Sequence, residues 1–150
     1  MTADEPTVEA DVRERIESDP FCATLGIDLV DLGPTSARTE LAVGEDLLNF
    51  HGTPHGGAVY SLADAAFAAA SNAQGKTALA IETNISYLDS VDVGATLVAT
   101  AEETHASGRT AEYEVVVTEN VEDRNENREG GNDGDDAARI ATFRGRVYRP

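Results

Sequence analysis

The sequence predicts a single domain of the α+β class, in which a curved antiparallel sheet wraps one long helix. Two observations support this prediction. One is an apolar, alanine-rich segment with helical spacing near the middle of the 150-residue chain. The other is a series of segments around it in which apolar and polar residues alternate, as they do in half-buried strands. The length is that of one domain with its own core.

The chain is expected to begin with a tail and a short helix within residues 1–20, and the main domain is expected to span residues 21–150. Apolar residues recur every four positions from Val8 to Ile16, which is the spacing of an amphipathic helix. Pro20 should end that helix, since it lacks the N–H that a helix interior requires.

Alternating segments predict six strands, near residues 25–32, 35–43, 79–87, 95–103, 111–118 and 139–148. Antiparallel pairing of consecutive strands is the simplest topology, so a meander around the helix is expected. Residues 119–138 carry eight acidic residues and almost no large apolar ones, which predicts a solvated acidic loop inserted in the domain. Its NDGDD segment lacks the spacing of a calcium loop, so no metal is expected there.

The central helix is expected from about Gly56 to Ala73. One stripe of it is apolar at helical spacing and comprises Val59, Leu62, Ala63, Ala66, Phe67 and Ala70. The opposite side consists mainly of alanine and serine. A helix that is apolar or small on every side is expected to be buried on every side.

Asp64 is the only charged residue between Asp46 and Lys76, in a chain otherwise rich in charge. A carboxylate in such a segment costs several kcal/mol unless it is solvated or paired. Desolvation should raise its pKa toward the range that suits a general base. Asp64 is therefore the first candidate for a catalytic residue.

The residues before the helix include Gly56 and Gly57. Glycines at a helix start leave the backbone N–H groups open to a ligand, and the helix dipole is positive there. These features predict a binding place for an oxygen that gains negative charge, such as the oxyanion of acyl transfer. His51 and His55 do not predict a metal site, because Pro54 interrupts any helix between them.

The charge balance also limits the function. The formal net charge is −17, and ten of the eleven basic residues are arginine. This surface is typical of proteins from a salt-rich cytoplasm, where salt screens the repulsion between carboxylates. Nucleic-acid binding is disfavoured because no basic stripe is present. No apolar run is long enough for a membrane helix. The single cysteine, Cys22, cannot form a disulfide within the chain, which fits a reducing cytoplasm. Cys22 is expected to be a small buried residue that fills space in the core.

The segment from Asn49 through His55-Gly56-Gly57 to Ser61-Leu62-Ala63-Asp64 resembles the hotdog-fold acyl-CoA thioesterases. The resemblance is strongest to the branch of the phenylacetic-acid-degradation thioesterases and extends over residues 21–148. It implies hydrolysis of an acyl-CoA thioester, aryl-acetyl or medium-chain, without a cofactor or metal. It also implies a homodimer with paired sheets and shared active sites, and a dimer of dimers (a homotetramer) as the expected assembly.

The resemblance also implies roles for individual residues. The Gly56 N–H would polarise the thioester carbonyl, Asn49 would help to position it, and His55 would orient the start of the helix. Asp64 of the partner subunit would act as general base or as nucleophile. Phe50, Tyr60 and Phe67 are expected to line the pocket for the acyl group, and Gly57 and Gly108 are further substrate-binding candidates. Arg109, which follows the Ser107-Gly108 turn, is the candidate for the coenzyme A phosphates, with Arg144 and Arg146 as second choices.

Two features depart from the family pattern. Some relatives hold the attacking water with a serine or threonine where this chain has Ala68 and Ala80, and the acidic segment at 119–138 replaces a short turn. Two other functions stay open: a non-catalytic acyl-CoA sensor, and a hotdog hydratase or dehydratase. The sequence leaves the acyl group undefined.

Overall fold

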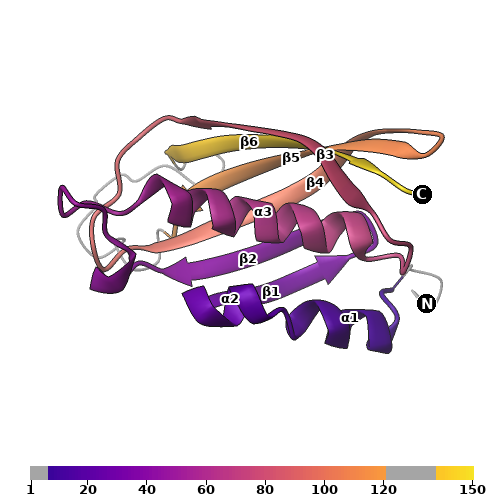
Figure 1. Ribbon diagram of the computed structural model, residues 1–150, viewed down its shortest axis with the longest axis horizontal. Helices are drawn as coiled ribbons and strands as arrows, with labels where there is room; N and C mark the ends of the chain where they lie inside the picture. Colours follow the sequence, from indigo (N-terminus) through magenta and orange to yellow (C-terminus); the bar gives the residue numbers. More distant parts are fainter. Residues whose placement is uncertain (1–6, 121–137) are drawn as a thin grey trace, which may run out of the picture.

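The computed structural model describes residues 7–120 and 138–150. Its helices are α1 (Ala10–Glu17), α2 (Pro20–Leu25) and α3 (Gly56–Asn72), with a short 3-10 helix at Glu45–Leu47. Its strands are β1 (Ile27–Gly33), β2 (Ser36–Ala42), β3 (Leu79–Tyr87), β4 (Thr96–Ser107), β5 (Thr110–Glu119) and β6 (Arg139–Tyr148). The sheet curves around α3, which confirms the predicted α+β hotdog arrangement (Figure 1). The acidic segment predicted at 119–138 lies almost wholly outside the described residues.

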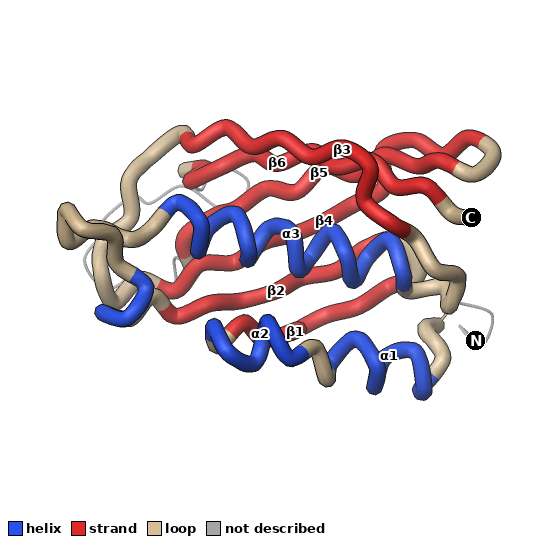
Figure 2. The backbone as a smooth tube through the Cα atoms, viewed as in Figure 1, coloured by secondary structure: helices blue, strands red, loops and turns tan. Residues whose placement is uncertain are grey.

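All six strands belong to one antiparallel sheet, in the order β1-β2-β4-β5-β6-β3. The expected meander is therefore wrong at β3, which pairs with β6 at the far edge instead of with β2. The physical reason is the helix between them. The chain leaves β2, runs along α3 across the concave face, and returns at the opposite edge of the sheet (Figure 2).

Helix α2 was not predicted, although its boundaries follow common rules. Asp19 is its N-cap, and the Asp19 carboxylate accepts a hydrogen bond from the Cys22 N–H. Pro20 occupies the first helical position, where its missing N–H costs nothing. Gly26 ends the helix in the left-handed conformation, with φ of 82°. Pro20 thus both ends the pattern of α1 and begins a second helix.

The core lies between the concave face of the sheet and the apolar stripe of α3. The buried Thr39 of β2 donates its hydroxyl hydrogen to the Leu62 carbonyl, which ties the helix to the sheet. On β6, Gly145 leaves room for the ring of Phe67, since a Cβ added there would lie 2.5 Å from that ring. The axial position and the rotation of α3 are therefore fixed by the sheet.

The prediction that α3 is buried on every side is wrong. Gly57 and Ala68 are exposed and Asp64 is half-buried, all on the side that faces away from the sheet. Helices α1 and α2 lie beside β1 and run along this outer side (Figure 1). No helix in residues 7–120 and 138–150 has the length and apolar character needed to cross a membrane.

Candidate active site

The first turn of α3 presents a free backbone donor. His55 is the N-cap, and its Nδ1 accepts a hydrogen bond of 2.8 Å from the Gly57 N–H. The His55 carbonyl accepts from the Ala58 N–H at 3.0 Å. The N–H groups of Gly57 and Ala58 are thus both used, whereas the Gly56 N–H has no hydrogen-bond partner among the described residues. It is one of the orphan donors of a helix start, at the positive end of the helix dipole.

Asn49 shapes the loop that leads to this turn. Its side-chain oxygen accepts hydrogen bonds from the His51 N–H and from both the N–H and the hydroxyl of Thr53. Its own N–H donates to the Thr53 carbonyl at 2.8 Å. Phe50 stands at the tip of the loop, where it is 92 % exposed and contacts the His51 ring. Asn49 therefore closes the loop in front of the helix.

Asp64 lies on the outer side of α3, two turns after Gly56. Desolvation raises the pKa of its carboxyl, and the nearby carboxylate of Asp19 raises it further. Both causes favour the protonated form, which brings the carboxyl nearer to the range of a general base. The expected direction of the pKa shift is thus confirmed, whereas the catalytic role of Asp64 stays a prediction.

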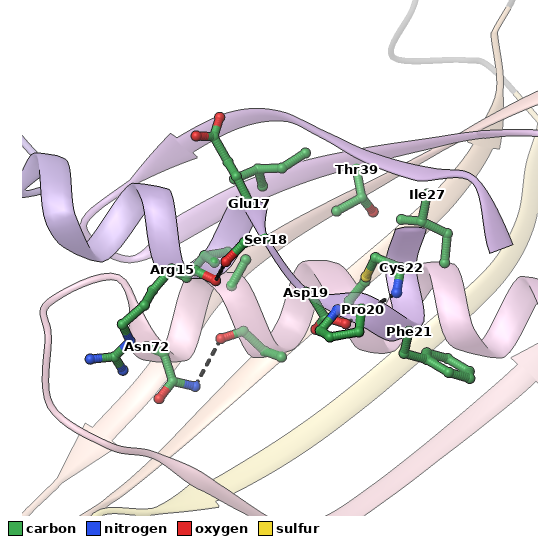
Figure 3. A pocket seen from close by; sticks show the side chains of 15 residues that line it. Arg15, Glu17, Ser18, Asp19, Pro20, Phe21, Cys22, Ile27, Thr39 and Asn72 are labelled. Carbon is green, nitrogen blue, oxygen red and sulfur yellow. Dashed lines mark hydrogen bonds between the residues drawn. The ribbon is translucent and has the colours of Figure 1, made fainter. Parts of the chain in front are cut away.

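A cavity of about 690 Å³ separates α1 and α2 from α3. Its apolar wall includes Phe21, Cys22, Leu29, Ala65 and Ala68. Arg15, Ser18 and Asn72 lie at one end, and Asp19, Cys22 and Phe21 lie toward the other (Figure 3). Cys22 packs against the core but is only half-buried and also lines this cavity, so it is less buried than expected. Burial is the main cause that raises its pKa to about 11, so the thiol stays protonated.

A smaller cavity of about 230 Å³ lies at the beginning of α3. It is lined by Leu25, Leu47, His55, Gly57 and Ser61, together with Phe21 from the larger cavity. The two cavities therefore follow the outer side of α3 from its first turn to its last. An apolar acyl group and a polar thioester could both be accommodated along this surface.

Two predicted substrate-binding residues, Phe50 and Tyr60, do not line either of the cavities along α3. The Tyr60 hydroxyl forms a hydrogen bond with Thr83 of β3, and the Tyr60 ring lies edge-on to Phe143. Phe50 is not among the residues that line either cavity along α3. Tyr60 therefore faces the sheet, next to the turn of α3 that carries Asp64.

The predicted phosphate-binding residues lie at the far end of the molecule. Gly108 and Arg109 form the β4–β5 turn, and the Arg109 guanidinium donates to the Tyr148 hydroxyl. The Arg109 carbonyl accepts from Arg149, whose guanidinium reaches the Ser71 carbonyl near the end of α3. Arg109 is thus separated from Gly56 by the length of the helix, about 25 Å.

The second-choice arginines lie on the last strand. Arg146 forms ion pairs with Glu82 and Glu112 on the neighbouring strands, at 3.5 and 3.9 Å. Arg144 sits opposite Glu114 of β5 and Asn84 of β3 in the strand register. The charge of Arg146 is therefore already shared between two carboxylates.

Two residues of this region were not predicted. Tyr87, the last residue of β3, donates its hydroxyl hydrogen to the Gly56 carbonyl at 3.0 Å. Asp19 lines the larger cavity, and its carboxylate raises the pKa of Asp64. The Asp19-Pro20 pair is a helix-start signal that could have placed Asp19, whereas no local signal links Tyr87 to Gly56. In the described part of the chain, no three His, Cys, Asp or Glu residues gather as metal ligands would.

Comparison with known proteins places this chain in a family. Residues 51–123 match the model of the thioesterase superfamily. The acyl-coenzyme A thioesterase PaaI of Escherichia coli is 38 % identical over 101 residues, which are 67 % of this chain and 72 % of that protein. A protein of Archaeoglobus fulgidus is 39 % identical over 97 residues, which are 65 % of this chain and 63 % of that protein.

Solved structures of similar proteins superpose on this chain. The E. coli PaaI structure superposes with a TM-score of 0.77 at 31 % identity, covering 92 % of this chain and 89 % of that chain. The TT0310 protein of Thermus thermophilus superposes with a TM-score of 0.74 at 37 % identity, covering 88 % of this chain and 98 % of that chain. This chain therefore belongs to the hotdog-fold thioesterase superfamily, in the branch that includes the E. coli enzyme PaaI.

Proposed function

We propose that this protein hydrolyses acyl-CoA thioesters, with the Gly56 N–H binding the oxyanion and Asp64 acting as general base or nucleophile. The observation that supports the proposal most directly is the free Gly56 N–H at the start of α3. The raised pKa of Asp64 adds a second group suited to acyl transfer. The name of the E. coli relative, an acyl-coenzyme A thioesterase, agrees with this chemistry.

The reaction needs both groups at one carbonyl. The thioester oxygen accepts the Gly56 N–H, and negative charge gathers on this oxygen as the tetrahedral intermediate forms. With Asp64 as base, its carboxylate takes a proton from the attacking water. The C–S bond then breaks, and coenzyme A leaves as a thiolate that receives a proton, which yields the free acid and the thiol. As a nucleophile, Asp64 would instead form an anhydride that water opens.

A single chain cannot bring these two groups together. Gly56 and Asp64 lie on the same helix about 12 Å apart along its axis, whereas both must reach atoms of one thioester. The proposed active site is therefore shared: Gly56 comes from one protomer and Asp64 comes from its partner. This requires a homodimer, and a dimer of dimers would hold four such sites.

The edge of the sheet offers a surface for that dimer. Strand β3 has a neighbour on one side only, and its apolar residues Leu79, Ile81 and Tyr87 are exposed. A long apolar edge strand without a partner is a template for pairing with another strand. Pairing of two β3 strands would also bring the two α3 helices side by side in opposite directions.

Within this dimer, the larger cavity would hold the acyl group and Arg109 of the partner would approach the coenzyme A phosphates. An aryl-acetyl or medium-chain acyl group is small enough for a cavity of about 690 Å³. The composition further supports action in a reducing, salt-rich cytoplasm. The acidic surface would be screened there, and the half-buried Cys22 would stay reduced.

The test is a hydrolysis screen over a panel of acyl-CoA thioesters in molar KCl, with a thiol reagent that detects free coenzyme A. Turnover of at least one thioester is expected. Binding of acyl-CoA without release of thiol would contradict the proposal and favour a sensor. Formation or loss of a double bond in the acyl group, followed by mass spectrometry, would instead favour a hydratase or dehydratase.

Complementation tests the shared site. Gly56→Pro removes the donor N–H, and Asp64→Asn removes the acid, so each variant should be inactive alone. After the two are unfolded and refolded together, half of the dimers are mixed and one of their two sites is intact, so about a quarter of wild-type activity should return. No recovery in dimers that have demonstrably mixed would mean that the two residues do not form one site across the interface.

A further inference from the structure

One peptide group at the start of α3 is held from both sides. It joins Gly56 to Gly57, and its carbonyl oxygen accepts a hydrogen bond of 3.0 Å from the Tyr87 hydroxyl. Its N–H donates to Nδ1 of His55 at 2.8 Å. The Tyr87 ring also covers Gly56 closely, since a Cβ added to Gly56 would lie 3.3 Å from the ring and from the hydroxyl oxygen. This peptide group can therefore neither rotate nor shift without losing two hydrogen bonds.

The neighbouring peptide group carries the free donor. It joins His55 to Gly56, its carbonyl accepts the Ala58 N–H at 3.0 Å, and its N–H is the unpartnered one of Gly56. Only the backbone torsions of Gly56 lie between these two peptide groups. Glycine has the widest torsional freedom of any residue, so an unrestrained Gly56 would let this N–H sample many directions. The contact with Tyr87 supplies the restraint that a side chain on Gly56 would otherwise give.

We propose that Tyr87 is a positioning residue for thioester hydrolysis, because it fixes the direction of the Gly56 N–H through the hydrogen bond to the Gly56 carbonyl. The inference rests on the proposed function, in which that N–H stabilises the oxyanion. A donor that is oriented before the reaction begins needs no reorganisation as charge develops, which is the main advantage of an oxyanion hole. Tyr87 acts through Gly56 and does not need to touch the substrate.

Two further observations fit this role. In the single chain, the Tyr87 side chain is 53 % exposed at the edge of the sheet, so it is not part of the buried core. Burial of part of the ring raises the pKa of Tyr87, and the nearby Tyr60 adds to the effect. The hydroxyl therefore stays protonated and remains a hydrogen-bond donor across the pH range of an ordinary assay.

The experiment removes the hydroxyl alone. Tyr87→Phe keeps the ring against Gly56 and deletes only the hydrogen bond to the Gly56 carbonyl. With the best substrate of the acyl-CoA panel, kcat should fall about tenfold while KM stays within about twofold, the pattern of an interaction that matters only in the transition state. Hydrogen exchange at the Gly57 amide, followed by NMR, should become about fivefold faster because its peptide group is held from one side only.

Thr104→Val is the matched control. It also deletes a single exposed hydroxyl, which donates to the Glu112 carbonyl on the β4–β5 hairpin and takes no part in the contacts around Gly56. It should leave both kcat and Gly57 exchange unchanged. If Tyr87→Phe keeps wild-type kcat, or raises only KM, the positioning role is wrong although the thioesterase proposal stands. If the wild-type protein hydrolyses no acyl-CoA, the proposed function fails, and this role fails with it.

Discussion

Asp19, the N-cap of α2, and Asp64 on α3 are close enough for the Asp19 carboxylate to raise the pKa of the Asp64 carboxyl. The two residues come from separate helices, α2 and α3, both of which line the large cavity, and desolvation raises the pKa of Asp64 more strongly than Asp19 does. A half-buried acid beside a like charge resists ionisation. The role of Asp64 can therefore be tested by changing its ionisation, either by substitution or by pH.

Asp64→Asn should lower kcat by about 10²-fold or more, because an amide cannot accept the proton of the attacking water. The folding stability of this variant, unlike its kcat, should not fall. The folded state holds the Asp64 proton to a higher pH than the unfolded state does, so stability falls as the pH rises between the two pKa values. At neutral pH, removal of this acid should leave the melting temperature unchanged or slightly higher. Near-normal turnover by a folded Asp64→Asn dimer would remove Asp64 from the mechanism.

The pH profile of kcat/KM should report the same carboxyl. Activity should rise with pH through the pKa of Asp64, and the midpoint of this rise should lie above the ordinary value for aspartate because burial raises that pKa. Asp19→Asn should shift the midpoint to lower pH by removing the like charge. Asparagine is as good an N-cap as aspartate, so α2 should remain intact. A midpoint that does not move in this variant would contradict the coupling between the two carboxylates.

Gly56→Pro should abolish hydrolysis without unfolding the protein. Proline is well tolerated at the first position of a helix, and the extended backbone of His55, with φ −69° and ψ 133°, can precede it. Only the N–H is lost, at an expected cost of about 10²-fold or more in kcat. Gly56→Ala is the control, since it adds a similar contact with the Tyr87 ring but keeps the N–H. Equal activity of the two variants would exclude the Gly56 amide as the oxyanion donor.

His55→Ala should destabilise the protein by about 1 kcal/mol, because the Gly57 N–H loses its capping acceptor. kcat should also fall, by about tenfold, as the first turn of α3 loosens around the Gly56 donor. His55→Asn restores a good capping side chain and should recover most of the stability and activity. If the asparagine variant is stable but as slow as the alanine variant, the imidazole acts on the substrate and not through the cap.

Most of the secondary structure was predictable because it follows local patterns. The apolar stripe that contains Leu62 and Phe67 placed α3 to within one residue of its observed end. Strand order was not predictable in this way. Ile85 of β3 pairs with Phe143 of β6, a partner distant in sequence, and nothing in the alternation of either segment selects the other.

The candidate site was predictable where it depends on a helix start and a nearby carboxylate. Gly56, His55 and Asp64 all lie on α3 or at its cap, as expected from glycine, capping and charge patterns. The burial of Asp64 was overestimated, because the small residues on the outer side of α3, such as Ala68, border a cavity and not the sheet. Tyr87 could not be foreseen, since its contact with Gly56 joins a strand edge to a helix start.

Gly145 should tolerate no side chain, because the concave face of the sheet and α3 meet there. A Cβ at Gly145 would lie 2.5 Å from the Phe67 ring, and this ring is enclosed by Phe143 and Tyr113 at centroid distances of 5.5 and 5.8 Å. Since the ring has no room to move, Gly145→Ala should destabilise the protein by about 1–3 kcal/mol.

Phe67→Leu supplies the matched partner for this change. Alone it should destabilise the protein by leaving a cavity, but together with Gly145→Ala it should recover about 1 kcal/mol or more of the summed loss, since the smaller side chain makes room for the new methyl group. Denaturant unfolding of the two single variants and the double variant measures this coupling. Simple additivity of the two losses would show that α3 can move away from β6, and the axial position of Gly56 and Asp64 would then not be set by this contact.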